Sequence, residues 1–403
     1  MSESISAATQ DTDRRQAATA GDRSQRRPLV LVSVATFAFW VSLYLYGPIL
    51  PLRAKELGAS PALIGAVVAA YAIGQLTLRI PVGIGSDMFG RKPFAVGAIF
   101  LCALGAAWLG AAGNPWMLFA ARTLTGIGAA GWVAISVLYA SHFPPDRPGR
   151  AMAAAMAINT TGILVATLIG GELAERLGSS AAFYGAAGVG VAGVLVMLAV
   201  KEPAPASRPP YSINTLVRLL RSRLLLQVSA IAIALQFVTF GVNFGFLPIF
   251  AEGLGATKAQ IGYITAVGLV AAIMGTLLSQ VVARRYGSTA AVLIGIGATI
   301  ASLLALPPTD GLALLGIGQA VNGFGRGMLN TVLISLALQS APTHERATAM
   351  GTYQAIYAIG MLTGPLICGV IAGQAGINWV FWTSAAVITA GGALVFVRKL
   401  PQV

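Results

Sequence analysis

Residues 50–65, LPLRAKELGASPALIG, return further along the chain as residues 247–262, LPIFAEGLGATKAQIG. A shift of 197 positions aligns the two segments, and nine of the sixteen residues are then identical. The same shift sets Gly126 and Gly128 against Gly323 and Gly325. We therefore expect two halves of similar structure, built from an internal repeat.

Composition places both halves in a membrane. Of the 403 residues, 56% are hydrophobic and only 10% are charged, whereas a soluble domain carries about 25% charged residues. The 48 glycines suit helices that pack closely in lipid, where small residues let backbones approach one another. A water-soluble fold would have too little charge to cover its surface.

Twelve apolar segments are long enough to cross a bilayer, for which a helix needs about 20 residues. They lie near residues 29–50, 62–84, 93–112, 115–140, 151–172, 180–200, 224–250, 260–282, 289–306, 311–338, 347–373 and 378–397. This pattern predicts an all-α membrane protein with twelve transmembrane helices in two pseudo-symmetric six-helix bundles.

The predicted bundles span residues 29–200 and 223–399. Residues 201–222 between them are rich in proline and predict a cytoplasmic linker, in which Leu216, Leu219 and Leu220 are spaced for a short surface helix. The polar residues 1–28 predict a disordered cytoplasmic tail.

Basic residues give the orientation. If the N-terminus is cytoplasmic, 19 of the 26 Lys and Arg lie on the cytoplasmic side and four on the outer side, with Arg79, Arg122 and Arg326 inside spans. This asymmetry follows the positive-inside rule. We expect a multi-pass protein of a bacterial-type inner (plasma) membrane with both termini cytoplasmic. The net charge of +13 then needs no nucleic-acid partner.

Few residues suggest metal, cofactor or enzyme chemistry. Cys102 and Cys368 lie inside apolar segments, and His142 and His344 fall in short polar loops. Neither pair has the spacing of a metal site, and no nucleophile and base come together in the sequence. We expect no metal, no cofactor and no enzymatic activity.

The loop after the second span, residues 83–92, reads GIGSDMFGRK and combines Gly83, Asp87, Gly90, Arg91 and Lys92. It resembles the signature loop between spans two and three of the major facilitator superfamily, G-x-x-x-D-R/K-x-G-R-R/K, although Met88 replaces a base. The resemblance implies a cytoplasmic latch in which Asp87 pairs with Arg91 and faces a helix end. An ordinary solvated loop is the alternative.

The fourth span carries Arg122, Gly126 and Gly128, which resemble the R-x-x-x-G-x-G motif of proton-coupled members of that superfamily. A buried arginine either tunes a nearby acid or holds substrate, or it locks helix packing; both interpretations stay open. In the fifth span Ala166-Thr167 replace the Gly-Pro of the superfamily's antiporter motif, and the eleventh span has Gly364-Pro365 instead.

Spans one, four, seven and ten line the central cavity in this superfamily. In span ten, Asn322, Arg326 and Asn330 recur every four residues and share one helix face. Arg326 is the leading candidate for a substrate contact. Other polar and aromatic side chains are candidates by the same face argument: Trp40, Tyr44, Gln75, Arg79, Gln236, Asn243, Gln354 and Tyr357.

A coupling acid is hard to find. None of the 13 acidic residues lies in the middle of a span, and Glu172 is the best remaining candidate. Arg122 and Arg326 instead suit an anionic, zwitterionic or neutral amphipathic substrate, because a buried charge needs a partner.

The resemblance covers nearly the whole chain after residue 28 and is closest to the twelve-span drug/proton antiporter (efflux) branch. It implies a secondary active transporter that exports small organic molecules, drug-like or metabolite, by alternating access, with a coupling proton and the lipid bilayer as partners and a monomeric state. An importer or exchanger of a small organic anion is the first alternative, and a non-transporting receptor or scaffold is the second.

Overall fold

The computed structural model of the protein describes residues 27–143, 148–202, 213–342, 345–397 and 400–402. Nearly all of the predicted tail and the middle of the predicted linker lie outside the described residues. Every regular element in the described ranges is a helix, as the sequence predicts.

Each half contains six membrane-spanning segments, which we call rods; a rod consists of one helix or of consecutive helices that continue one another. The first rod runs over Arg27–Tyr44, turns at residues 45–49 and continues as α2 (Leu50–Glu56). The rest of the first half is α3 (Pro61–Phe89), α4 (Arg91–Ala111), α5 (Pro115–Ala130) with α6 (Trp132–Ala140), α7 (Pro148–Leu177) and α8 (Ser179–Ala199).

The short helix α9 (Ile213–Leu220) lies between the halves in sequence, within the predicted linker. The second half comprises α10 (Arg223–Phe237) with the π-helix η1 (Val238–Phe246) and α11 (Leu247–Gly253), α12 (Lys258–Tyr286), α13 (Ser288–Ala305), α14 (Leu312–Gln339), α15 (Arg346–Gln374) and α16 (Ile377–Val397).

The prediction of twelve transmembrane helices is confirmed. Eleven helices of the described residues are both long and apolar enough to cross a bilayer. The twelfth is α14, which has 28 residues but carries Gln319, Asn322, Arg326 and Asn330. These polar side chains lower the hydropathy of α14.

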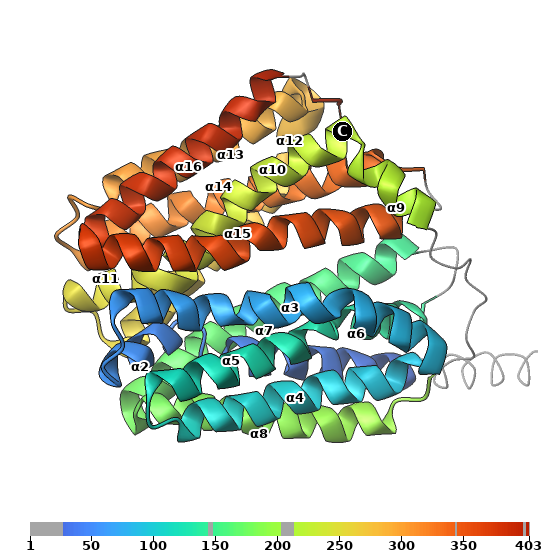
Figure 1. Ribbon diagram of the computed structural model, residues 1–403, viewed down its shortest axis with the longest axis horizontal. Coiled ribbons are helices and arrows are strands. Elements are labelled where there is room, and N and C mark those ends of the chain that lie inside the picture. The colour runs from blue at the N-terminus through green and yellow to red at the C-terminus, as the bar shows by residue number, and fades with distance from the viewer. Residues whose placement is uncertain (1–26, 144–147, 203–212, 343–344, 398–399, 403) are drawn as a thin grey trace, which may run out of the picture.

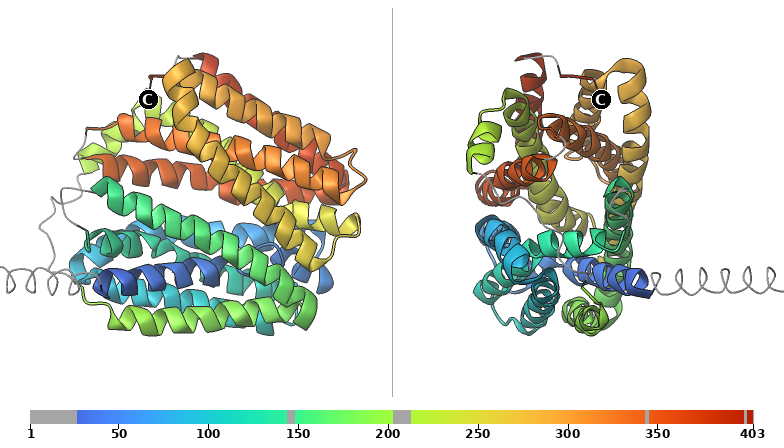
Figure 2. Two further views of the ribbon diagram at one scale, coloured as in Figure 1. Left: turned by 180° about the vertical axis from the view of Figure 1, so that it is seen from behind. Right: turned by 90° about the vertical axis from the view of Figure 1, so that its right-hand side faces the viewer.

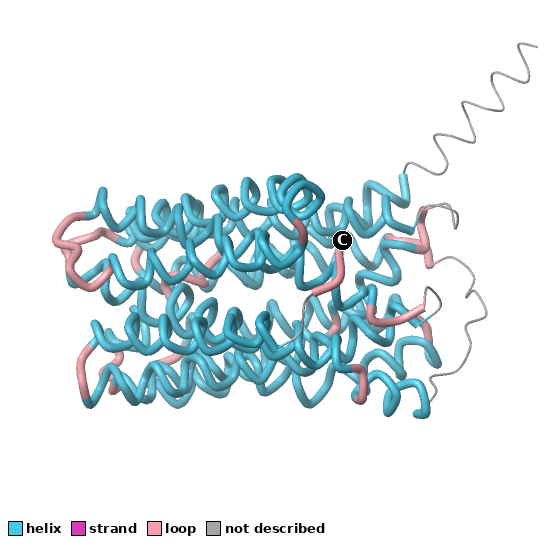
Figure 3. Tube along the Cα trace, turned by 90° about the horizontal axis from the view of Figure 1, so that it is seen from above, coloured by secondary structure: helices cyan, strands magenta, loops and turns pink. Residues whose placement is uncertain are grey.

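The two halves lie one above the other in Figure 1, with α3–α8 below and α10–α16 above. The rods run in a common direction, so that the loops gather at two ends (Figure 3). We call the end with α9 and residues 87–91 the linker end, and the end with α2 and α11 the far end. Seen from behind, α7 and α12 meet toward the far end (Figure 2).

Local sequence explains where the rods begin and end. Ser60, Asn114 and Ser222 each accept a hydrogen bond from the backbone N–H three residues ahead, and Thr257 forms a capping box with Gln260. At the linker end, Gly90 and its repeat partner Gly287 have φ of +95° and +87°. Only glycine adopts such angles without strain, so the chain turns directly into the next helix.

Three rods predicted as single segments are interrupted. The first is broken at residues 45–49, the fourth at Gly131 between α5 and α6, and the seventh contains η1. Pro48 and Pro248 lie in or directly after two of these irregular stretches, where proline lacks an N–H to continue the helical ladder. Interrupted helices expose backbone groups and re-aim side chains, and they are common at membrane transport sites.

Close backbone contacts join the halves at the far end. A Cβ on Gly65 would lie 2.1 Å from the Pro365 carbonyl oxygen, and one on Gly262 would lie 2.7 Å from that of Thr167. The two glycines are repeat partners, so α3 packs on α15 as α12 packs on α7. Glycine permits both approaches because it has no side chain.

Candidate substrate site between the two halves

Arg122 ties three helices of the first half together. Its side chain is 7% exposed, and Nη1 donates to the Tyr46 hydroxyl at 3.0 Å. The guanidinium lies over the Tyr71 ring, 4.5 Å from the centroid, a cation–π contact. Tyr46 lies in the break of the first rod and Tyr71 in α3. The charge of Arg122 is thus used to hold α5 against its neighbours.

The second half repeats this bond without the charge. A shift of 197 residues carries Arg122 to Gln319, Tyr46 to Asn243 and Tyr71 to Gly268. Gln319 Nε2 donates to Asn243 Oδ1 at 3.1 Å, so the same two positions are bonded in each half. Asn243 lies in η1, the counterpart of the break that holds Tyr46.

Arg326 occupies the space that glycine leaves in the second half. A Cβ on Gly268 would lie 3.9 Å from Arg326 Nη2 and 3.2 Å from Gln319 Oε1. Arg326 is half-buried, and its Nε is fully buried without a hydrogen-bond partner. Its guanidinium makes no hydrogen bond or ion pair with the described residues. Of the charged residues predicted to contact substrate, Arg326 is the one without a hydrogen-bond or ion-pair partner among the described residues.

The other predicted residues of α14 separate from Arg326. Asn330, one turn nearer the linker end, is exposed. Asn322 is fully buried, and neither atom of its amide has a partner among the described residues. It lies on the stripe that faces α13, where the Ser302 hydroxyl donates to the Gly318 carbonyl and Gly325 packs on Gly295. Asn322, four residues before Arg326, therefore faces the interior of the second six-helix bundle.

Aromatic side chains pack near Arg122, and two of their contacts cross from one half to the other. Tyr71 stacks on Phe240 with centroids 6.0 Å apart, and the Tyr44 and Phe244 rings lie 5.6 Å apart. Trp40 makes an edge contact with Trp132 at 5.0 Å. We call these six side chains the aromatic belt. Tyr46, Tyr71, Trp132, Phe240 and Phe244 were absent from the predicted substrate set; the 197-residue shift would have marked Tyr46 and Tyr71 as partners of Asn243 and Gly268.

The remaining predicted contacts are distributed over α3, α10 and α15. Gln75 is buried and accepts a hydrogen bond from Arg79 Nη1 at 3.2 Å. Gln236 and Gln354 are half-buried. Tyr357 is half-buried beside Tyr353, with centroids 5.2 Å apart. Among the described residues, none of these side chains forms a hydrogen bond with Arg326.

The predicted latch loop is anchored within its own half. Asp87 Oδ1 lies 3.7 Å from Arg91 Nη2. Glu202, at the end of the sixth rod, accepts hydrogen bonds from the backbone N–H groups of Arg91 at 2.6 Å and Lys92 at 3.0 Å. A carboxylate at a helix N-terminus is favourable. Sequence reasoning missed Glu202, because it meets α4 only in the folded bundle.

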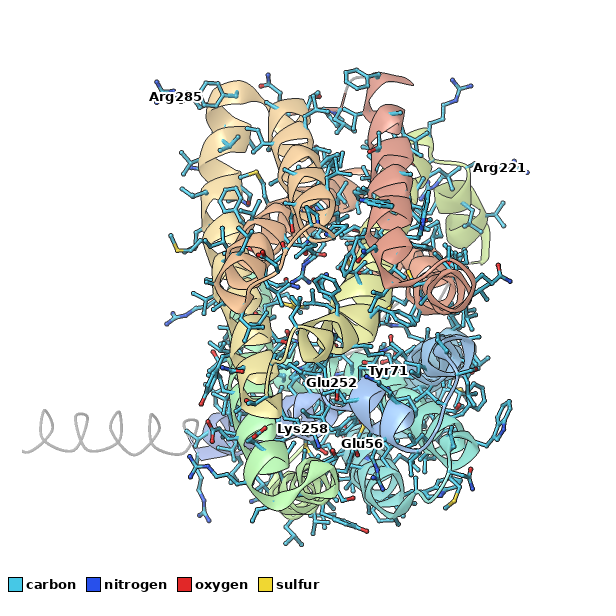
Figure 4. All side chains as sticks on the ribbon, turned by 90° about the vertical axis from the view of Figure 1, so that its left-hand side faces the viewer. Glu56, Tyr71, Arg221, Glu252, Lys258 and Arg285 are labelled. Atoms are coloured by element: carbon cyan, nitrogen blue, oxygen red, sulfur yellow. The ribbon has the colours of Figure 1, made fainter. Side chains whose placement is uncertain are left out.

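The far end is closed by polar contacts between the halves. Lys55 Nζ lies 2.6 Å from Glu252 Oε2, and these two residues are themselves repeat partners. Lys258 Nζ lies 2.7 Å from Glu56 Oε1, and the Tyr263 hydroxyl donates to Glu172. Figure 4 shows Glu56, Glu252 and Lys258 together between the halves, whereas Arg221 and Arg285 lie at the periphery.

The Glu56 carboxyl has an altered pKa in this cluster. Partial burial alone would raise its pKa, but hydrogen bonds from Lys258, Ser179 and Arg53 outweigh burial and hold the pKa below its ordinary value. The charged form of Glu56 is therefore the one that suits the closed far end.

The fold and these motifs agree with comparisons to known proteins. A family model described as Major Facilitator Superfamily matches residues 32–244 and 229–403. The chain belongs to this superfamily. An uncharacterized MFS-type transporter of Methanocaldococcus jannaschii is 25% identical over 91% of this chain and 97% of its own length.

Two further superfamily proteins extend the comparison. The Multi-drug resistance efflux pump PmrA homolog of Lactococcus lactis is 26% identical over 86% of this chain and 89% of its own length. The crystal structure of a bacterial homologue of the human lysosomal transporter Spinster, inward-facing and occupied, superposes with a TM-score of 0.78 at 16% identity, covering 92% and 95% of the two chains. As a superfamily member, the chain is a multi-pass membrane transporter of small molecules and not an enzyme.

Proposed function

We propose that this superfamily transporter exports small organic molecules, drug-like compounds or metabolites, across the inner membrane by alternating access, driven by protons. Relatives named as efflux pumps support the direction of transport. The basic residues of the loops support a cytoplasmic linker end. We expect the protein to act as a monomer.

The observation that carries the proposal is the distribution of ion pairs between the halves. Lys55–Glu252 and Lys258–Glu56 bridge the halves at the far end. At the linker end, Asp87–Arg91 lies within the first half, and Arg218 pairs with Glu345 between α9 and α15. If the far-end ion pairs break while the two halves come together at the linker end, access to the site changes from one side of the membrane to the other.

The latch role of Asp87 belongs to this proposal. When the linker end closes, the Asp87–Arg91 pair would meet the second half and stabilise the alternate state. Loss of the carboxylate would leave the far-end contacts intact and slow the return step. Glu172, which joins the halves through Tyr263, is the proposed proton-binding acid.

Proton movement in inside-out vesicles tests the proposal. A fluorescent reporter follows an imposed pH gradient while lipophilic cations, neutral amphipaths and organic anions are added in turn. We expect one class to dissipate the gradient with the wild type and with Asp310→Asn, an exposed carboxylate that belongs to none of the ion pairs named above. Asp87→Asn should give a much slower response, because it slows the return step.

The outcomes separate the parts of the proposal. Substrate accumulation without proton movement would contradict proton coupling but retain export. Equal responses from Asp87→Asn and wild type would contradict the latch. No accumulation of any class by correctly folded protein would contradict the export of drug-like molecules.

A further inference from the structure

We propose that the transported molecule is an amphipathic organic anion, whose carboxylate or sulfonate binds Arg326 while its aromatic body packs on the aromatic belt. This inference names the substrate class of the proposed exporter and therefore rests on that function. It follows from the charges inside the spans, the difference between the two arginines and the aromatic belt.

The charge argument compares three arginines. Arg79 donates to Gln75, and Arg122 donates to Tyr46 and lies over Tyr71. The guanidinium of Arg326 has no such partner among the described residues, and its Nε is buried. Every carboxylate of the described residues lies near a helix end or in a loop. A cation held at membrane depth is costly until an anion binds to it.

The second argument compares what packs against the arginine in each half. Tyr71 packs beneath Arg122 in the first half, and Gly268 stands at the same repeat position in the second. Among the described residues, no aromatic ring lies over the Arg326 guanidinium, whereas Tyr71 lies over that of Arg122. Arginine offers several N–H donors in a planar fork that matches a carboxylate in a bidentate manner. Asn330, exposed one turn away, supplies a further amide donor toward the linker end.

The aromatic belt indicates the chemical character of the rest of the substrate. Phe240 and Phe244 flank Asn243 in η1, and Asn243 is bonded to Gln319, two turns before Arg326 on α14. Aromatic rings favour flat apolar groups through stacked and edge contacts. One anionic group and an aromatic body would satisfy both parts of the site.

Three probes with the same ring system and different charges test the inference: indole-3-acetate, indole-3-acetamide and tryptamine. Binding to purified, lipid-reconstituted protein is measured by equilibrium dialysis of each radiolabelled probe. We expect the anion to bind about tenfold more tightly than the amide, because a charge-assisted hydrogen bond is stronger than a neutral one. Tryptamine should bind more weakly than either.

Variants assign the effect to Arg326. Arg326→Gln should reduce binding of indole-3-acetate about tenfold and leave binding of indole-3-acetamide unchanged. Arg326→Lys should retain most of the preference for the anion, because it retains the charge. Arg285→Gln removes an arginine at the periphery (Figure 4) and should match the wild type. If Arg326→Gln does not fold, the probe series on wild type and Arg326→Lys still decides the question.

Equal binding of the amide or of tryptamine, absence of anion binding, or an unchanged preference in Arg326→Gln would overturn the inference. Vesicle uptake of the same probes separates it from the proposed export. Uptake of tryptamine or the amide without preference for the anion would leave export standing and overturn the substrate class. Selective anion binding without uptake would support the substrate class and contradict export.

Discussion

Arg122 is buried in the first half and Arg326 is half-buried in the second, and they differ in what their charge does. Arg122 is bonded to Tyr46 and lies over Tyr71, so its charge stabilises helix packing. The equivalent bond in the second half joins Gln319 to Asn243 and is neutral. The arginine of that half lies two turns further along α14 and has no bonded partner among the described residues. The same two positions are therefore hydrogen-bonded in both halves. In the first half the arginine is part of that bond, whereas in the second half the arginine lies outside it and is available to bind an anion.

The largest effect should come from disrupting the close helix packing at Gly126 and Gly323, which occupy equivalent positions in the two halves. A Cβ on Gly126 would lie 2.3 Å from the Tyr71 carbonyl oxygen, and one on Gly323 would lie 1.9 Å from that of Gly268. Because backbone atoms cannot yield as side chains do, Gly126→Ala and Gly323→Ala should each abolish the folded peak in size-exclusion chromatography. Gly351→Ala, with open space around its Cβ, is the control. A normal peak for either variant would show that this close packing is not required for folding.

The second prediction separates the two arginines. Arg122→Lys loses the stacked, planar contact with Tyr71 and should cost about 2 kcal/mol of stability. Arg326→Lys should melt close to the wild type, because no bonded partner is lost. Thermal unfolding followed by tryptophan fluorescence measures both. Equal losses would show that Arg326 has a structural role like that of Arg122.

The third prediction concerns the space at Gly268. A Cβ there would lie 3.2 Å from Gln319 Oε1, which is tight but not impossible. Gly268→Ala should cost about 1 kcal/mol and weaken binding of indole-3-acetate about fivefold. Gly297→Ala in α13, where the Cβ meets open space, should leave the affinity unchanged. Identical affinities for the two variants would place the anion elsewhere.

The fourth prediction is a pH dependence of the far end. Because the pKa of Glu56 is lowered when the halves are closed, closure is stabilised above the ordinary carboxyl pKa and is lost as the pH falls through the lowered value. Spin labels at Gly113→Cys and Gly253→Cys, both in open space, should move apart as the medium is acidified. In Glu56→Gln the distance should be insensitive to pH over that range; a pH response like that of the wild type would exclude Glu56 as its source.

The smallest effect should come from the Lys55–Glu252 pair, in which repeat partners face each other with opposite charge. Its side chains are 52% and 34% exposed, and exposed pairs contribute about 0–1 kcal/mol. Lys55→Glu should change the transport rate by less than about fivefold, and adding Glu252→Lys should restore it. Vesicle uptake of indole-3-acetate measures both rates. Failure of the double variant to recover would mean that the two side chains do not act as a pair.

Much of the fold could be predicted because hydropathy is a local property. The twelve apolar segments match the observed rods to within a few residues, except where a break divides a rod. The breaks depend on which neighbours accept the freed backbone groups, and hydropathy carries no signal for them. The π-helix η1 is as apolar as the helices around it.

The candidate site was predicted less completely, for reasons that differ between residues. Arg326 stood out because a charge in an apolar segment is rare. Asn322 was placed on the same face, but a four-residue step rotates a helix by about 40°, and here that rotation turns it toward α13. Glu202 and Trp132 have no local signal, since each acquires its role from a distant segment.

The measurement that tests the central claim most directly is a reversible cross-link across the far end. Lys55→Cys and Glu252→Cys place thiols where the side chains now lie 2.6 Å apart, and the native Cys102 and Cys368 are buried. A short cleavable bismaleimide should stop vesicle transport of indole-3-acetate, and cleavage of the linker should restore it, because the far end must open in each cycle. Transport at the uncross-linked rate with the cross-link in place would contradict alternating access by these two halves.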